Sequence, residues 1–343
     1  MSQSTAFELG VETAEAYVRE HGLVPPEAPV RVEELAGGVS SSVIAIRGGG
    51  VGLVLKQALP KLRVDDDWRA KIERTDTEAS ALELYTALTP DSVPRLVHQD
   101  STNHVLVMEL APGDRRNWQA EIAQARPHLD AAAWAGETLG TWHRDTADDA
   151  PVAARFDDHE AFAQLRLDPF HATVAERRPE LASLVLPYLD ELRDVRCCLV
   201  HGDFAKKNML IGPSGRWVID HEVAHFGNPV FDVAFFLSFV VLSAVRWPPL
   251  RDDMQRLGDR FLDAYHATAG AAFAGDAAAI SGHTACLVLA RTDGKSPAPF
   301  LGDARADARE VGIGMLREPE LGLWDWLDRR PDGSETTERE VDT

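Results

Sequence analysis

The spacing of hydrophobic and polar residues changes character once along the chain, near residue 110. Before that point, short apolar runs rich in β-branched residues are separated by glycine clusters, which predicts a meander of antiparallel strands. Two further stretches carry apolar residues at helical spacing. We therefore expect strands at 32–35, 43–47, 51–57 and 104–110, and helices at 11–21 and 74–88.

The pattern after about residue 115 is alanine-rich and mostly helical. Three short apolar runs interrupt it, and turn residues such as Gly212 and Gly215 bound them, so we expect short buried strands there. These strands are placed at 198–200, 209–211 and 217–219. A helical region containing 131–143 is expected to reach about residue 195, with further helices at 231–245, 251–268 and 276–291.

The chain has 343 residues, more than one hydrophobic core usually serves, so we expect two lobes. The predicted fold class is α+β: a small antiparallel-sheet lobe at 1–110, a larger and mainly helical lobe at 111–327, and a polar tail at 328–343. The turn sequence Ala111-Pro112-Gly113 stands where a two-lobed protein would have its hinge.

The chain carries 35 basic and 55 acidic residues, a formal charge of −20 at pH 7. This charge repels polyanions, so neither nucleic acid nor a membrane surface is expected as a partner, whereas a neutral or cationic small molecule would be tolerated. The longest apolar stretch, 230–245, contains Asp232 and is shorter than the roughly 20 residues of a membrane span. Three cysteines and the absence of a secretory signal indicate a cytoplasmic protein, and the oligomeric state stays open.

Residues 201–222 place two carboxylates and one amide beside short apolar strands. Asp203 and Asn208 lie in the sequence HGDFAKKN, and Asp220 lies in VIDHE. Phosphoryl transfer needs a positioned nucleophile and metal ions that neutralise the phosphates. One carboxylate can accept the proton of a substrate hydroxyl, and the other two oxygen donors can hold Mg2+. Taken singly, Asp203 would also suit a turn and Asn208 a cap.

HGDFAKKN followed by VIDHE resembles the catalytic loop and metal-binding motif of the aminoglycoside phosphotransferase and choline kinase-like families. Those families share the two-lobed protein kinase-like fold. The resemblance implies that Asp203 is the catalytic base, Asn208 a magnesium ligand and Asp220 the principal metal carboxylate. It further implies that His201 orients the loop. Glu222 is implied as a second metal ligand, because methylthioribose kinases also carry an acid two residues after the aspartate.

Lys56 ends an apolar run, where its stem can pack while its ammonium group reaches a phosphate, although a surface lysine is the common alternative. The sequence VLKQALPKLRV resembles the methylthioribose kinase stretch around the phosphate-binding lysine. Glu78 matches the helix glutamate that pairs with that lysine, and a solvated helix face is its alternative. The resemblance therefore implies an ion pair that orients Lys56 towards ATP.

Two backbone segments complete the expected nucleotide site. The loop GGVSSS has small residues that permit close approach of a phosphate, but it also suits an ordinary hairpin turn. The strand at 104–110 is expected to offer backbone groups to the adenine edge, with a plain edge strand as the alternative. The residues concerned are Ser40, Ser41 and Ser42 in the loop, and Met108, Glu109 and Leu110 at the end of the strand.

The resemblance places the acceptor between the catalytic loop and the helical part of the larger lobe. The candidate contacts are Asp203, His221, Asp232, Arg291, Asp293 and Lys295. Asp232 is better suited to bracing the loop through hydrogen bonds, and RTDGK at 291–295 could equally be a helix end with a glycine cap. Trp142 and His143 are predicted to pack under the loop.

One position separates the chain from methylthioribose kinases, whose catalytic loop characteristically lacks an asparagine at the place of Asn208. Here the chain has the aminoglycoside phosphotransferase-like pattern. Together the motifs predict an enzyme that uses ATP and Mg2+ to phosphorylate a hydroxyl of a sugar, an aminoglycoside or a related polar metabolite. A nucleotide-binding pseudokinase with a regulatory or scaffold role is the alternative, which the joint presence of all these residues disfavours.

Overall fold

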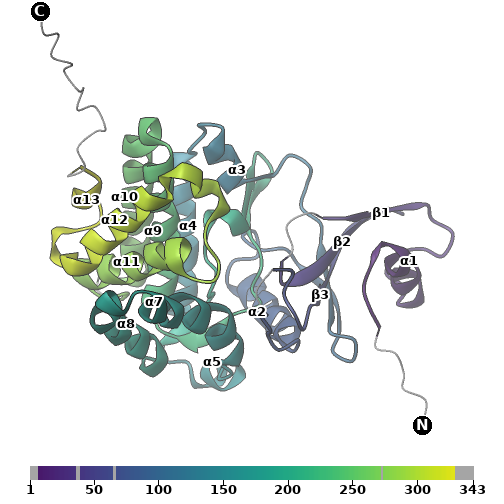
Figure 1. Cartoon of the computed structure of the whole chain (residues 1–343). Helices are drawn as coiled ribbons and strands as arrows, with labels where there is room; N and C mark the ends of the chain where they lie inside the picture. Colours follow the sequence, from purple (N-terminus) through teal and green to yellow (C-terminus); the bar gives the residue numbers. More distant parts are fainter. Residues whose placement is uncertain (1–6, 36–38, 65–66, 272, 329–343) are drawn as a thin grey trace, which may run out of the picture.

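A computed structural model of the chain describes residues 7–35, 39–64, 67–271 and 273–328. Figure 1 shows a sheet-containing lobe in purple and blue beside a helical lobe in green and yellow. The sheet is antiparallel, with the strand order β1-β2-β3-β5-β4. Its strands are β1 (Val30–Glu34), β2 (Ser41–Gly48), β3 (Val51–Ala58), β4 (Leu96–Asp100) and β5 (Val105–Glu109), accompanied by the helices α1 (Val11–Glu20) and α2 (Arg74–Leu88).

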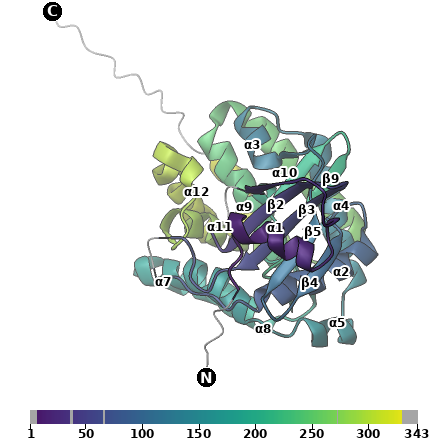
Figure 2. The ribbon, with the colours of Figure 1, turned by 90° about the vertical axis from the view of Figure 1, so that its right-hand side faces the viewer.

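The two faces of this sheet contact different parts of the molecule. Because side chains alternate along a strand, Leu55 of β3 packs in a cluster with Tyr17 and Val18 of α1, and the next residue, Lys56, projects to the opposite face. Figure 2 shows α1 lying across the outer face of the sheet. Lys56 forms an ion pair with Glu78 of α2, so α2 and the larger lobe lie on the other side.

The larger lobe is built around α9 (Val230–Arg246), all of whose residues from 230 to 245 are buried. A helix that is hydrophobic all round belongs in the middle of a core. α10 (Arg251–Ala269) and α11 (Ala277–Asp293) pack against α9, and α4 (Leu129–Asp145) packs on α10. The other helices are α3 (Trp118–Ala123), α5 (Ala150–Arg155), α6 (Glu160–Phe162), the π-helix η1 (Ala163–Ala172), α7 (Thr173–Arg177), α8 (Ala182–Asp194), α12 (Arg305–Arg317) and α13 (Asp325–Asp328).

Two small sheets hold the loops that carry the motifs HGDFAKKN and VIDHE. β7 (Cys198–Val200) pairs with β10 (His225–Gly227), and β8 (Met209–Gly212) lies between β6 (Arg116–Asn117) and β9 (Gly215–Val218). The segment 201–208 leaves β7 and enters β8, and 219–222 follows β9. Strand pairing therefore anchors the ends of both motifs.

The predicted α+β fold class, with a small antiparallel sheet and a larger helical part, is confirmed. α2 begins and ends at the predicted residues, 74 and 88, whereas β4 and α12 were not predicted. β4 escapes a pattern search because it is short and none of its residues is fully buried. The lobe boundary at 110 stays a prediction, and the tail beyond residue 328 lies outside the described residues. Among the described helices, none combines the length and apolarity that crossing a membrane requires.

Gly136 allows α4 and α10 to approach each other closely. A Cβ atom on Gly136 would lie 2.3 Å from the carbonyl oxygen of Phe261 and 2.9 Å from the amide nitrogen of Tyr265. Because both contacts are to the backbone of a packed helix, Gly136→Ala should lower the free energy of unfolding by about 1–3 kcal/mol. Urea denaturation followed by circular dichroism measures this loss.

Gly113→Ala is the matched control, since a Cβ atom on Gly113 has no heavy atom within 4 Å. Its free energy of unfolding should stay within about 0.5 kcal/mol of the unsubstituted protein. Equal losses in the two variants would show that the α4–α10 contact is not what makes Gly136 necessary.

Candidate active site

The loop that follows β7 is held from beneath by one buried carboxylate. Asp232, near the start of α9, accepts hydrogen bonds from the amides of His201 at 2.6 Å and Gly202 at 2.8 Å, and its other close partner is His143 Nε2 at 3.3 Å. The Nδ1 atom of His201 in turn accepts a hydrogen bond of 3.1 Å from the amide of Asp203. These bonds fix the backbone that presents Asp203, as expected for His201.

Three donors surround the Asp203 carboxylate. Arg166, from the π-helix η1, lies 3.0 Å from Oδ1, and the side-chain amide of Asn208 donates to Oδ2 at 2.6 Å. Lys207 also donates to Oδ2. Because Asp203 is only 2% exposed and contacts donors from both sides, its carboxylate has a defined orientation in the cleft.

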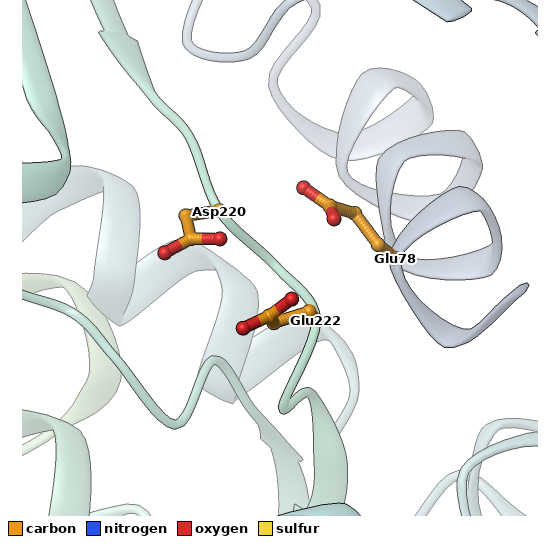
Figure 3. A group of neighbouring side chains, drawn as sticks. All are labelled: Glu78, Asp220 and Glu222. Carbon is orange, nitrogen blue, oxygen red and sulfur yellow. The ribbon is translucent and has the colours of Figure 1, made fainter. Parts of the chain in front are cut away.

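A second group of charged residues joins the two lobes. The Lys56 ammonium nitrogen lies 2.7 Å from Glu78 Oε2 and 3.5 Å from Glu222 Oε2, and it also donates to Asp220 Oδ1. One oxygen from each of these three carboxylates lies within 4.8 Å of the others. Figure 3 shows Glu78 on α2 facing the segment after β9 that carries Asp220 and Glu222.

Arg74 completes this ionic cluster, which we define as Lys56, Arg74, Glu78, Asp220 and Glu222. The Arg74 Nε atom lies 3.3 Å from Glu222 Oε2, and its guanidinium group also donates to the carbonyl of Ser40 at 2.6 Å. Two cations thus face three carboxylates, so the cluster retains negative charge when all its members are ionised.

The pKa values follow from burial and from this charge balance. Burial raises the pKa of Glu78 to about 7, against the opposing effect of Lys56 and with the help of Asp220 and Glu222. Burial would also raise the pKa of Asp220, but Lys56 and Lys207 outweigh it and hold that pKa well below its usual value. The pKa of Lys56 is raised, because the three carboxylates outweigh the effect of burial.

The oxygen atoms here suit a hard divalent cation such as Mg2+. Asp220 lines the cleft with 28% of its side chain exposed, and its backbone has a positive φ of 71° that turns the residue out of the strand direction. The Asn208 amide nitrogen is committed to Asp203, which leaves the carbonyl oxygen as its possible metal ligand. Glu222 Oε2 is engaged by Lys56, Arg74 and the Ser41 hydroxyl.

A cleft of about 980 Å3 between the lobes brings both groups together. Most of the residues expected from the sequence line it: Ser40, Ser41, Lys56, Glu78, Met108, Glu109, Leu110, Asp203, Asn208, Asp220, Glu222, Arg291 and Lys295. Gly37 and Gly38 of the expected phosphate loop lie outside the described residues. Ser42 faces away from the cleft, because its hydroxyl donates to the carbonyl of Leu9 at 2.8 Å.

Three expected acceptor contacts require correction. His221 is fully buried and packs against the rings of Tyr85 and Trp142. Asp232 is fully buried beneath the loop, which is the bracing position that the sequence favoured. Asp293 is bound by Arg178 and Arg309. None of the three lines the cleft, because the side chains point into the core or along the helix surface.

Comparisons with known proteins identify the family of the chain. The sequence model of the phosphotransferase enzyme family (APH) matches residues 31–279. The chain belongs to this phosphotransferase family. Methylthioribose kinase from Cronobacter sakazakii is 28% identical over 273 residues, which are 71% of this chain and 67% of that protein. Methylthioribose kinase 2 from Oryza sativa subsp. japonica is 25% identical over 244 residues, 62% of this chain and only 56% of that protein.

Solved structures show the same fold at low sequence identity. Choline kinase from Cryptosporidium parvum has a TM-score of 0.59 at 12% identity, and the match covers 93% of this chain and 100% of that one. Amicoumacin kinase, solved with AMP-PNP and Ca2+, has a TM-score of 0.55 at 16% identity, and the match covers 92% and 96%. The two-lobed protein kinase-like fold and the resemblance to phosphotransferases are thereby confirmed.

Sequence reasoning missed three cations of this candidate site. Arg74 opens α2 and Arg166 lies within the helical region, where neither belongs to a motif, so only the fold reveals their partners. Lys207 stands inside HGDFAKKN, four residues after Asp203. The spacing of four residues within one loop was a signal that could have suggested the contact between Lys207 and Asp203.

Lys206 occupies a different environment from its neighbour. It is fully buried, and its ammonium group donates to the Phe239 carbonyl and the Ser243 hydroxyl of α9, both at 3.2 Å. Burial lowers the pKa of Lys206 to about 7. Its contacts tie the loop 201–208 to the core helix α9 without reaching the cleft.

Lys206 should make stability depend on pH. Between pH 7 and the ordinary lysine pKa of 10.5, the unfolded chain binds a proton that the folded protein does not, so raising the pH stabilises the folded state. Lys206→Met removes this dependence. The free energy of unfolding of the unsubstituted protein minus that of Lys206→Met should therefore rise from pH 7 to pH 10, by at most about 1.4 kcal/mol per pH unit.

Urea titrations at pH 7, 8.5 and 10 measure this difference. Lys61→Met is the matched control, because the Lys61 side chain is 52% exposed and lies on the surface. A flat difference for Lys206→Met would mean that Lys206 stays charged in the folded protein at all three pH values.

Proposed function

We propose that this protein is an ATP-dependent small-molecule kinase that transfers the γ-phosphate to a hydroxyl group. One observation carries the proposal: Asp203, held by Arg166 and Asn208, lines the same cleft as the ionic cluster around Lys56. A base for the acceptor and charges for the phosphates are both needed for phosphoryl transfer, and both are present. The family to which the chain belongs supports the same assignment.

The nucleotide would bind beside the sheet. Lys56, oriented by Glu78, is the proposed phosphate ligand, and Ser40 and Ser41 lie at the same end of the cleft. The amides of Glu109 and Leu110 already donate to the carbonyls of Arg95 and Gly52, both at 3.0 Å. We therefore assign the carbonyl oxygens of this segment, rather than those two amides, to the adenine edge.

The acceptor hydroxyl would be activated by Asp203. As the hydroxyl oxygen forms its bond to the γ-phosphorus, the proton passes to the Asp203 carboxylate and the bond to the leaving ADP oxygen breaks. Arg166 and Lys207 keep the carboxylate in place and lie where negative charge develops. Mg2+, when held by Asp220 and Asn208 with Glu222 as a further candidate, would neutralise phosphate charge.

Asp203→Asn should remove the proton acceptor and leave the nucleotide side unchanged. Turnover should fall by about 10²- to 10⁴-fold, the usual contribution of a general base. ADP release with a panel of methylthioribose, aminoglycosides, amino sugars and choline, and slow ATP hydrolysis without acceptor, are the measurements. Asp130→Asn, at an exposed carboxylate on α4, is the matched control and should keep full activity.

Nucleotide affinity separates this prediction from the pseudokinase alternative. The dissociation constant of Mg-ADP, measured by calorimetry, should be nearly equal for the unsubstituted protein and Asp203→Asn. Retained turnover in Asp203→Asn would rule out the assigned base. ATP binding by the unsubstituted protein without transfer to any hydroxyl compound would instead favour the pseudokinase.

Asp220→Asn tests the proposed metal site. Removing this carboxylate takes away a charged oxygen ligand, so the Mg2+ concentration that half-saturates the stabilisation by ADP should rise about 10-fold or more. The melting temperature with ADP, recorded over a Mg2+ titration, measures this shift. An unchanged Mg2+ dependence would place the metal elsewhere.

A further inference from the structure

One part of the cleft next to Asp203 has a composition of its own. Its walls come from the segment before α2, from η1, and from the end of α11 with the chain that follows it, so we call it the acceptor half. Apolar side chains cover much of it, including Trp68, Leu165 and Phe170. Its charged residues are Asp203, Arg166, Lys207, Arg291 and Lys295.

Cations outnumber carboxylates in the acceptor half. Arg166 and Lys207 are paired with Asp203, the only carboxylate among the described residues that line this half. Arg291 and Lys295 then remain without an acidic partner in the cleft. A polycationic acceptor would find no unpaired carboxylate here, whereas an anionic group would find two cations.

Arg291 is the more informative of these two cations. It is only 9% exposed, and its Nε atom is buried without a hydrogen-bond partner. Its Nη1 atom donates to the Ser296 hydroxyl at 3.1 Å, and its guanidinium carbon lies 5.8 Å and 5.3 Å from the ring centroids of Phe170 and Phe239. A buried guanidinium charge is costly without an acidic partner, and no carboxylate of the described residues lies within ion-pair distance of Arg291, so its place in the cleft wall indicates an anionic ligand.

The charge of Arg291 persists in this environment. Burial lowers the pKa of Arg291 to about 10, and Asp203 acts in the opposite direction. The guanidinium group is therefore protonated at neutral pH. Arg291 and Asp203 line the same cleft, so one small molecule can contact both.

We propose that the acceptor is a hydroxyl compound with an anionic group, and that Arg291 binds this group while Asp203 takes the hydroxyl proton. This inference rests on the proposed kinase function and specifies its acceptor class. A guanidinium group binds the planar or tetrahedral oxyanion of a carboxylate, phosphate or sulfate through paired N–H donors. Lys295, an exposed lysine at the mouth of the same half, adds attraction for the anion.

Matched pairs of hydroxyl compounds test the acceptor class by binding. The Mg-ADP complex is titrated with three pairs of a carboxylate and its neutral counterpart: gluconate and glucitol, glycerate and glycerol, and pantothenate and panthenol. Glycerol 3-phosphate and glucose 6-phosphate form the phosphate arm. Kanamycin and choline form the cationic arm. The rise in melting temperature is the readout. We expect at least one anionic compound to stabilise the complex at a concentration about 10-fold or more below the concentration that its neutral counterpart requires. Whether this compound is a carboxylate or a phosphate shows which anion the site binds.

Arg291→Met keeps the packing against Phe170 and Phe239 but removes the charge. It should raise the half-saturating concentration of the anionic compound by about 10- to 100-fold, without changing the affinity for Mg-ADP. Arg256→Met, at an arginine on α10 whose side chain is 63% exposed, is the matched control and should change neither value.

Three results would overturn the acceptor class: no difference within any pair, tighter binding of the cationic arm, or an Arg291→Met variant that loses Mg-ADP affinity while keeping acceptor affinity. The last result would assign Arg291 to the nucleotide phosphates. Failure of the kinase proposal gives a different signature, because the unsubstituted protein would then transfer no phosphate to any hydroxyl compound, whether or not Mg-ADP stabilises it.

Discussion

The position of one buried ammonium group determines how the two lobes meet. Lys56 comes from the sheet, and its partners come from α2 and from the segment after β9 in the larger lobe. A buried charge must be paired, since an isolated one would cost far more than the fold can offset. The sheet, α2 and the segment that carries Asp220 are therefore constrained together, although Lys56 and Asp220 are 164 residues apart in sequence.

The same cluster explains why the cleft suits a metal-bound nucleotide. Lys56 and Arg74 supply two positive charges, and Glu78, Asp220 and Glu222 supply three negative ones when all are ionised. Burial is the main cause of the raised pKa of Glu78, and the charges of Asp220 and Glu222 add to it. A divalent cation would compensate for the excess of negative charge and for phosphate charge, so the apparent conflict between an acidic site and an anionic nucleotide disappears.

The core of the larger lobe also fixes the position of the loop 201–208, which carries Asp203. α9 is buried along nearly its whole length, so Asp232 near its start is as fixed as the core itself. Asp232 holds two loop amides, and Lys206 contacts α9 two turns further along. The loop is thus attached to one rigid helix at two points, which defines where Asp203 lies. This is the arrangement that a base needs if it is to meet a hydroxyl at a set distance.

The sequence predicted those site residues that lie in motifs directly beside predicted strands. The apolar runs before Asp203 and Asp220 mark the strands β7 and β9, and both residues line one cleft, although the two strands belong to different small sheets. Arg74 and Arg166 could not be found in this way, because their partners lie 148 and 37 residues away in the chain. His221 was misplaced for another reason: it adjoins Asp220, whose φ of 71° turns the chain, so neighbouring side chains point in different directions.

The net charge of the sequence likewise could not predict the electrostatics of the cleft. A formal charge of −20 suggested a neutral or cationic acceptor, but this sum runs over the whole surface. Salt screens exposed charges beyond about 8–10 Å, so a ligand inside the cleft responds mainly to the groups that line it. In the acceptor half of the cleft Asp203 is already paired, whereas Arg291 is a buried cation with no carboxylate partner among the described residues. The local arrangement therefore favours an anion in a protein that is strongly acidic overall.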